Sequence, residues 1–206
     1  MLPISFKVSF YFGNEENRMK PTIQKASSRS LVLAFSNWGF SWGGFLDNRK
    51  GEWWLIGQIL LIAGHVIPIW WSPFVHSGIV WPIWMTFFGL CLLLLGIFKS
   101  MKAFISLGEN LSPLPTPKSG SNMVQSGSYK SCRHPLYQGI LLSSFGVTIG
   151  WGSIFHALLL ISLIALLIGK AKREEVLLRK KYIDYEQYLR TTPAIIKWIP
   201  FLDWQS

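Results

Sequence analysis

The sequence has few cysteines, few acidic residues and no pattern of metal ligands. It contains 2 Cys and 4 His among 206 residues, and the positions of Cys91 and Cys132, in and beside apolar segments, suggest no disulfide framework. Neither residue type shows the spacing of a zinc site, so we expect no structural metal. Asp and Glu number 10 against 20 Lys and Arg. Because no basic patch falls on a recognisable soluble module, nucleic-acid binding is not expected.

Charge is also missing from long apolar runs. Residues 53–72 and 79–98 each form a run of 20 residues without Lys, Arg, Asp or Glu, which matches the ~20 residues that a helix needs to cross a bilayer. The apolar region 136–169 is long for one span, and Gly-Trp-Gly at 150–152 divides it into 135–150 and 153–169. The sequence therefore predicts an all-α, polytopic membrane helix bundle with about four transmembrane helices.

The basic residues predict how the spans are oriented. Lys and Arg fall in three blocks, 7 in residues 1–50, 5 in 99–133 and 8 in 170–206. With four spans all three blocks lie on one side of the membrane, as the positive-inside rule expects. We therefore expect a multi-pass membrane protein with cytoplasmic N- and C-termini, in a prokaryotic inner membrane or an organellar membrane. Its partners would include membrane lipids.

The remaining segments divide into an N-terminal part and the membrane domain, 51–206. Residues 1–50 are expected to be basic, interfacial and partly disordered. The connection 99–134 contains the turn-rich stretch NLSPLPTPKSGSN, and loops of this length are often functional. Residues 170–190 are expected to continue as a cytosolic C-terminal helix, on which Glu174 and Leu178 share a face with tyrosines.

The stretch CRHPLYQG, at 132–139, places polar residues where the third span begins. Pro135 favours the first position of a helix, which leaves His134 just outside it and Tyr137 in the first turn. The free N–H groups of the helix start and the guanidinium of Arg133 favour an anion. Alternatively, Arg133 and His134 are anchors that meet lipid headgroups.

Two adjacent acids follow the fourth span. If 135–150 and 153–169 pair antiparallel, Glu174 and Glu175 return beside Arg133 and His134. Carboxylates near an anionic bilayer surface need partners, and Glu174 points towards packing. Glu175 has a plainer alternative, an exposed pair with Arg179 at i,i+4.

The chain resembles the isoprenylcysteine carboxyl methyltransferase family, within the wider set that includes phospholipid methyltransferases. The resemblance covers roughly residues 107–200, including Gly127-x-Tyr129, RHPxYxG at 133–139, Glu174-Glu175 and Tyr185-x-x-Tyr188. It implies an S-adenosyl-L-methionine pocket that faces the cytosol. The residues that it implies as cofactor-binding are His134, Pro135, Tyr137, Gly139, Glu174 and Glu175, and those that it implies as catalytic are Arg133, His134 and Glu174.

The implied activity is methyl transfer to a lipid-linked or amphipathic acceptor. Such a displacement needs alignment more than acid–base groups, although an amine, phenol or thiol acceptor would require a base such as His134. Three alternatives stay open: a phospholipid or amine N-methyltransferase, a nicotinamide-dependent membrane reductase, and a non-enzymatic membrane factor. The chain departs from the family pattern at Cys132, at Ile183 and in the segment 188–197. The resemblance implies that the C-terminal helix closes the pocket, and these departures concern the shape of that lid and the choice of substrate.

Overall fold

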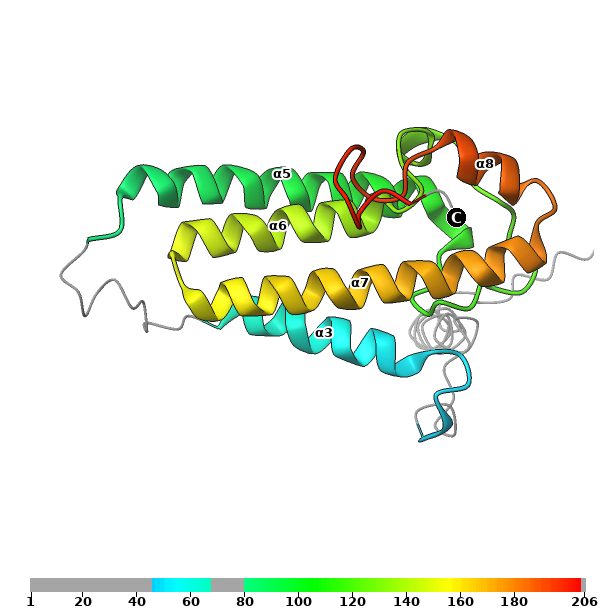
Figure 1. Ribbon diagram of the computed structural model, residues 1–206, viewed down its shortest axis with the longest axis horizontal. Helices are drawn as coiled ribbons and strands as arrows, with labels where there is room; N and C mark the ends of the chain where they lie inside the picture. The colour runs from blue at the N-terminus through cyan, green and yellow to red at the C-terminus, as the bar shows by residue number, and fades with distance from the viewer. Residues whose placement is uncertain (1–45, 68–79, 205–206) are drawn as a thin grey trace, which may run out of the picture. The chain divides into compact units, whose positions relative to one another are not determined.

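The computed structural model describes residues 46–67 and 80–204, and the regular structure within these ranges is helical (Figure 1). The expectations for residues 1–45, and for the end of the first predicted span at 68–72, lie outside the described residues. The elements are α3 (Glu52–Val66), α5 (Ile83–Leu107), η1 (Gly108–Asn110), η2 (Gly127–Lys130), α6 (Pro135–Trp151), α7 (Ile154–Lys181) and α8 (Tyr185–Thr191). The all-α prediction is confirmed for the described part of the chain.

The helical hairpin α6–α7 brings the start of α6 back beside the second half of α7. Pro135 is in the first turn of α6, as predicted, and Gly152 caps its other end with φ 57° and ψ 36°. This left-handed conformation favours glycine, and α7 begins two residues later, at Ile154. The predicted break at Gly-Trp-Gly is therefore confirmed, and Figure 1 shows the two helices side by side.

Helices α5 and α6 approach one another closely through glycines. A Cβ atom added at Gly89 would lie 2.5 Å from the backbone nitrogen of Gly150, and one added at Gly139 would lie 2.6 Å from that of Ser100. Because both neighbours are backbone atoms, no side chain is accommodated there, which is typical of small residues between membrane helices. Gly139 therefore faces α5 and fixes the helix that carries Tyr137.

Two helices in the described residues are long and apolar enough to cross a membrane. The segments are Ile83–Asn110, with mean hydropathy 1.9, and Ile154–Lys181, with mean hydropathy 2.3. Helices α3 and α6 are shorter, at 15 and 17 residues. Four transmembrane spans, and the placement of both termini on one side, therefore stay predictions. The second predicted span, 79–98, is displaced, because its helix begins at Ile83 and continues to Leu107.

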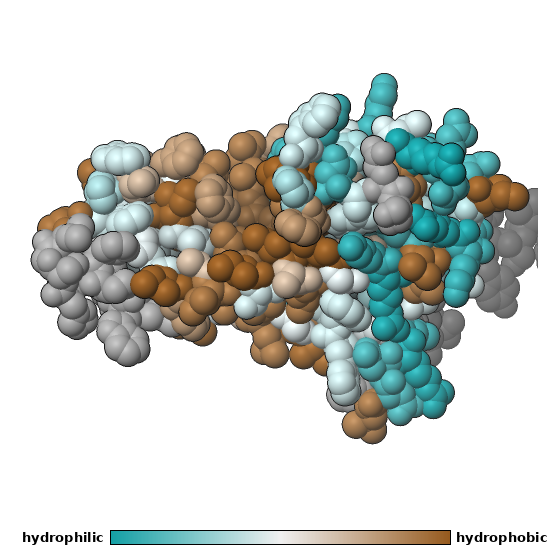
Figure 2. Space-filling model, viewed as in Figure 1, coloured by the Kyte–Doolittle hydropathy of each residue, from teal (hydrophilic) through white to brown (hydrophobic). Residues whose placement is uncertain are grey.

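Apolar and polar surfaces separate along the helices. Figure 2 shows brown residues over the middle of the α5–α7 bundle and teal residues at the end that carries α8. Large exposed apolar side chains on α5 include Phe87, Leu94, Phe98 and Ile105. Helix α5 therefore presents an apolar surface of the kind that faces lipid.

The prediction of one continuous helix over 170–190 is wrong. Helix α7 ends at Lys181, and Tyr182 is extended, with φ −122° and ψ 119°. The hydroxyl of Tyr182 donates to the backbone oxygen of Ser121 at 2.6 Å, so a contact with the preceding loop replaces the next helical turn. The chain resumes as α8 at Tyr185 and turns back towards the start of α6.

Candidate active site

The C-terminal segment pairs with the start of α6. The backbone N–H groups of Arg133 and His134 donate to the oxygens of Pro193 and Ala194, at 2.9 and 3.0 Å. Within the first turn of α6, the side-chain amide of Gln138 donates to the backbone oxygen of Ile195 at 2.9 Å. Residues 193–195 thus fix the position of the RHP motif from outside the helix.

Glu175 is the centre of a buried polar cluster. One carboxylate oxygen lies 2.9 Å from Nε of Arg133 and 2.9 Å from Nε2 of His134. The other accepts a hydrogen bond from Nε1 of Trp204 at 2.7 Å. The side chains of Glu175 and Arg133 are 4% and 0% exposed. The basic and acidic motifs therefore meet, as predicted, and the alternative pair of Glu175 with Arg179 is wrong, since Arg179 pairs with Glu186.

The guanidinium group of Arg133 has internal partners on all three nitrogens. Besides the Glu175 ion pair, Nη1 donates to the backbone oxygen of Leu189 at 2.6 Å and Nη2 donates to that of Trp204. These contacts join α8 and the C-terminal segment to α6. The side chain of Arg133 thus connects three segments around Glu175.

Glu174 is the more exposed of the two acids, so the expectation that it is the one pointing towards packing is wrong. Its carboxylate accepts a hydrogen bond from the hydroxyl of Tyr137 at 2.9 Å, and its side chain is 28% exposed. The ring of Tyr137 stacks on His134, with centroids 5.3 Å apart and an interplanar angle of 3°. Nδ1 of His134 lies 3.8 Å from Glu174, too far for a hydrogen bond. Glu174 thus offers a carboxylate that can still bind a ligand.

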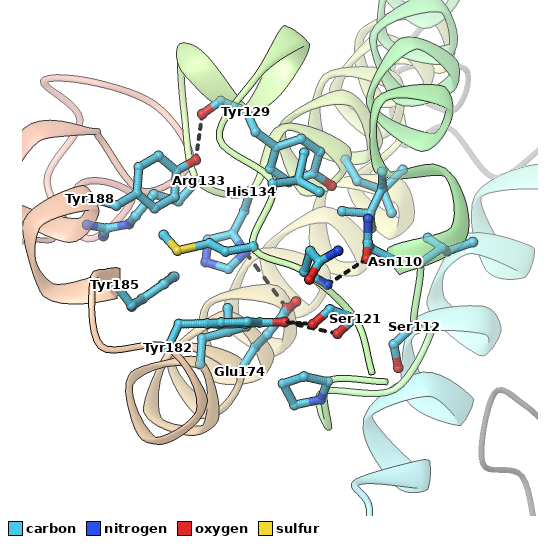
Figure 3. A pocket seen from close by; sticks show the side chains of 18 of the residues that line it. Asn110, Ser112, Ser121, Tyr129, Arg133, His134, Glu174, Tyr182, Tyr185 and Tyr188 are labelled. Carbon is cyan, nitrogen blue, oxygen red and sulfur yellow. Dashed lines mark hydrogen bonds and ion pairs between the residues drawn. The ribbon is translucent and has the colours of Figure 1, made fainter. Parts of the chain in front are cut away.

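A pocket opens beside Glu174 and is ringed by tyrosines (Figure 3). Tyr129, Tyr182, Tyr185 and Tyr188 come from η2 and from the region around α8, and they face the pocket together with Tyr137. The loop after α5 covers another side, where the N–H of Asn122 donates to the side chain of Asn110 at 2.8 Å. The further lining residues are Leu107, Leu111, Ser112, Pro117, Ser121, Met123, Val124, Arg133, His134, Leu136 and Leu178.

Burial keeps the hydroxyl and thiol groups at this site protonated. It raises the pKa of Tyr129, and the nearby carboxylate of Glu174 raises it further. The pKa values of Tyr185 and Tyr188 are raised mainly by the same cause. Burial also raises the pKa of the Cys132 thiol to about 11. At neutral pH these groups are uncharged, so Glu174 is the one acidic side chain among the described residues that line the pocket.

The predicted site residues divide into two groups. Arg133, His134, Tyr137 and Glu174 line the pocket, whereas Pro135, Gly139 and Glu175 do not. Direct cofactor contact by the second group therefore stays a prediction, and their observed contacts support the lining residues. Within the described ranges, no cluster of three or more His, Cys, Asp or Glu is arranged to hold a metal ion.

Trp204 is a site residue that the sequence did not reveal. It donates to Glu175, and its ring lies 6.3 Å from that of His134, between centroids. It also lies beyond the end of the family resemblance, near residue 200. The closing aromatic pattern FLDW was the only available signal, and aromatic residues in this chain are too frequent for that signal to stand out.

Comparison with known proteins identifies the region that holds most of these residues. The phospholipid methyltransferase family model matches residues 84–184. Curated proteins and solved structures gave no significant match. The match begins in α5 and ends just before α8, so it includes the RHP motif and both acids. Residues 84–184 are a phospholipid methyltransferase domain, of the membrane methyltransferase group that resembles isoprenylcysteine carboxyl methyltransferases.

Proposed function

We propose that the protein transfers a methyl group from S-adenosyl-L-methionine to a lipid-linked or amphipathic acceptor. The observation that carries this proposal is the partly exposed carboxylate of Glu174 in a tyrosine-ringed pocket of a phospholipid methyltransferase domain. When bound, the cofactor would supply a methyl group on a positively charged sulfonium sulfur.

The residues at the pocket fit such a cofactor. Glu174 accepts a hydrogen bond from Tyr137 through one carboxylate oxygen, and its partly exposed side chain lines the pocket. A carboxylate and electron-rich tyrosine faces both favour cations, and Leu107, Leu111 and Leu136 offer apolar surface for a flat base. We infer that Glu174 and the tyrosines hold the cofactor, with the amides of Asn110 and Asn122 available for its polar groups.

Arg133 and Glu175 would serve this site indirectly. Because the guanidinium of Arg133 has buried partners on every nitrogen, we infer that it positions the RHP motif and does not bind the cofactor's carboxylate. Glu175 accepts from His134 through Nε2. Since a carboxylate only accepts, Nε2 must carry a hydrogen. In the neutral imidazole, Nδ1 is then the nitrogen able to receive a proton from an amine, phenol or thiol acceptor.

The position of the pocket supports a membrane-derived acceptor. It lies where α5 gives way to the loop after Leu107 and where the apolar part of α7 has ended. An amphipathic molecule can place its polar end at this level and keep its apolar part against the exposed apolar residues of α5. Substrate choice would then depend on the loop 107–124 and on neighbouring apolar surfaces.

Incubation with labelled methyl donor tests the proposal. Purified full-length protein in detergent, supplied with labelled S-adenosyl-L-methionine and membrane lipid extract, should transfer label to an organic-soluble fraction. Glu174→Gln should reduce the rate strongly, whereas Glu109→Gln should not, because Glu109 is an exposed acid outside the pocket lining. Folded protein that binds a nicotinamide cofactor instead, or that labels lipid equally with and without Glu174, would contradict the proposal.

A further inference from the structure

Residues 195–202 form a C-terminal hairpin, in which the N–H groups of Ile195 and Ile196 donate to the oxygen of Leu202. This hairpin presents three apolar side chains to its surroundings. Trp198, Ile199 and Phe201 are 83%, 44% and 84% exposed. A single exposed apolar residue is common on protein surfaces, but a cluster that includes two large aromatic rings indicates an interaction site. We call Lys197–Phe201 the hairpin tip.

The hairpin tip is held in an unfavourable backbone conformation. Trp198 and Phe201 have φ values of 69° and 68°, in the left-handed region that bulky L-residues rarely adopt. Such conformations are strained and persist where the surrounding structure determines them. Here Asp203 accepts the N–H of Trp198 at 3.3 Å and that of Ala194 at 3.2 Å.

The base of the hairpin is firmly attached to the bundle. The N–H of Ile195 donates to the oxygen of Leu202 at 2.9 Å. The side chain of Ile195 is fully buried and that of Leu202 nearly so, in a core cluster that includes Tyr137 and Leu167. The aromatic rings of the hairpin tip are therefore held outward by an ordered base.

The hairpin lies at the level where the apolar surface of the bundle ends. Its base is bonded to Gln138 in the first turn of α6, and Gln138 accepts a hydrogen bond from Lys99 of α5 at 2.7 Å. Lys99 is the first charged residue of α5 after the apolar run that includes Phe98. Figure 1 shows the red C-terminal segment passing across α6 at this level. Tryptophan is enriched at such boundaries between hydrocarbon and headgroups.

We propose that the hairpin tip is a membrane anchor that inserts into the headgroup region of the leaflet nearest the candidate active site. Trp198 and Phe201 would enter the upper acyl layer. The ammonium group of Lys197, which lies 4.6 Å from the centroid of the Trp198 ring, would meet lipid phosphates. A second copy of the chain is a less suitable partner for the hairpin tip than the bilayer. Stable protein interfaces bury about 1,200–2,000 Å², far more than three side chains supply. This inference does not depend on the proposed reaction.

Lipid-dependent quenching tests the proposal on the full-length protein. A nitrobenzoxadiazole fluorophore attached to Phe201→Cys, in a Cys91→Ala background, is compared with the same label on Ile183→Cys. Ile183 is 94% exposed but follows the end of α7, beyond Lys181, and is the matched control. Cys132 is 2% exposed and should not react. In phosphatidylcholine vesicles with shallow spin-labelled lipid, the label at 201 should be quenched at least ~threefold more than the label at 183.

Three results would overturn the anchor. The first is quenching at 201 no greater than at 183. The second is protection of the label at 201 from water without lipid quenching, lost on dilution of the protein, which would identify a second copy as the partner. The third is the same protection at every dilution, which would mean that the chain itself covers the hairpin tip. Trp198→Cys repeats the measurement if Phe201→Cys does not fold, as judged by circular dichroism and gel filtration.

Discussion

Alanine substitution of the two adjacent acids should have very different effects on stability. Glu175 is 3% exposed as a residue and contacts Arg133, His134 and Trp204 at 2.7–2.9 Å. Glu175→Ala therefore leaves the buried guanidinium of Arg133 without its ionic partner and the indole N–H of Trp204 without its acceptor. Glu174 is partly exposed and accepts a hydrogen bond from the hydroxyl of Tyr137. Glu174→Ala removes one hydrogen bond at the edge of a pocket that water can enter.

The magnitudes follow from these contacts. Removing one partner of a buried ion pair costs about 3–5 kcal/mol, whereas the net contribution of an ordinary hydrogen bond is about 0.5–1.5 kcal/mol. For a chain of this size each kcal/mol corresponds to a shift of roughly 2–4 °C in the unfolding midpoint. In detergent, Glu175→Ala should therefore lower the midpoint by roughly 6–20 °C, and Glu174→Ala by roughly 1–6 °C.

Thermal unfolding in detergent, followed by circular dichroism, measures both shifts in one experiment. Glu175→Gln is the conservative control, because its amide oxygen can still accept from Trp204 while the ion pair is lost, and its midpoint should lie between those of Glu175→Ala and the parent. Equal shifts for the two alanine variants, or a larger one for Glu174→Ala, would refute the division between a buried structural acid and a ligand-facing acid.

Further predictions concern packing, protonation and the C-terminal segment. Gly89→Ala should strongly lower the unfolding midpoint, because its Cβ meets backbone at 2.5 Å, whereas Gly150→Ala, with its nearest neighbour at 3.8 Å, should be tolerated. The free energy of unfolding should fall between pH 9 and 11, because folded Cys132 keeps its proton up to a pKa of about 11 while the unfolded thiol loses it near 9.0. This contribution should disappear from denaturant titrations of Cys132→Ala. Trp204→Phe, which loses the hydrogen bond to Glu175, should lower stability by about 1.5–3 kcal/mol in the same titrations, and an unchanged value would contradict its positioning function.

Local features of the sequence predicted the helical hairpin well. Pro135 fixed where α6 begins, and the glycines at 150–152 fixed where it ends, because both residue types restrict or permit specific backbone conformations. With these two points known, the approach of Arg133 and His134 to the two acids follows from antiparallel pairing. The place where the RHP motif meets Glu174 and Glu175 was therefore predictable without knowing which side chains bond to one another.

The functions of the two acids were not predictable in the same way. Adjacent residues on a helix point about 100° apart, and either Glu174 or Glu175 can face the partner helix in a pattern of mixed apolar and charged residues. Which of the two acids is buried depends on where Arg133 and Trp204 lie in the folded protein. The break in the helix at Tyr182 has the same origin, since a hydrogen bond to Ser121, 61 residues earlier in the chain, overrides a local helical pattern.

Calorimetric binding of S-adenosyl-L-methionine is the most direct test of the account. The purified full-length protein in detergent should bind this compound, and Glu174→Gln should weaken binding by at least ~tenfold, equivalent to about 1.4 kcal/mol, without a large change in the unfolding midpoint. Glu109→Gln removes the same charge from an exposed position away from the pocket and should bind as the parent does. Absence of binding by the folded parent, or equal affinity in the parent and Glu174→Gln, would contradict the assignment of this pocket as the methyl-donor site.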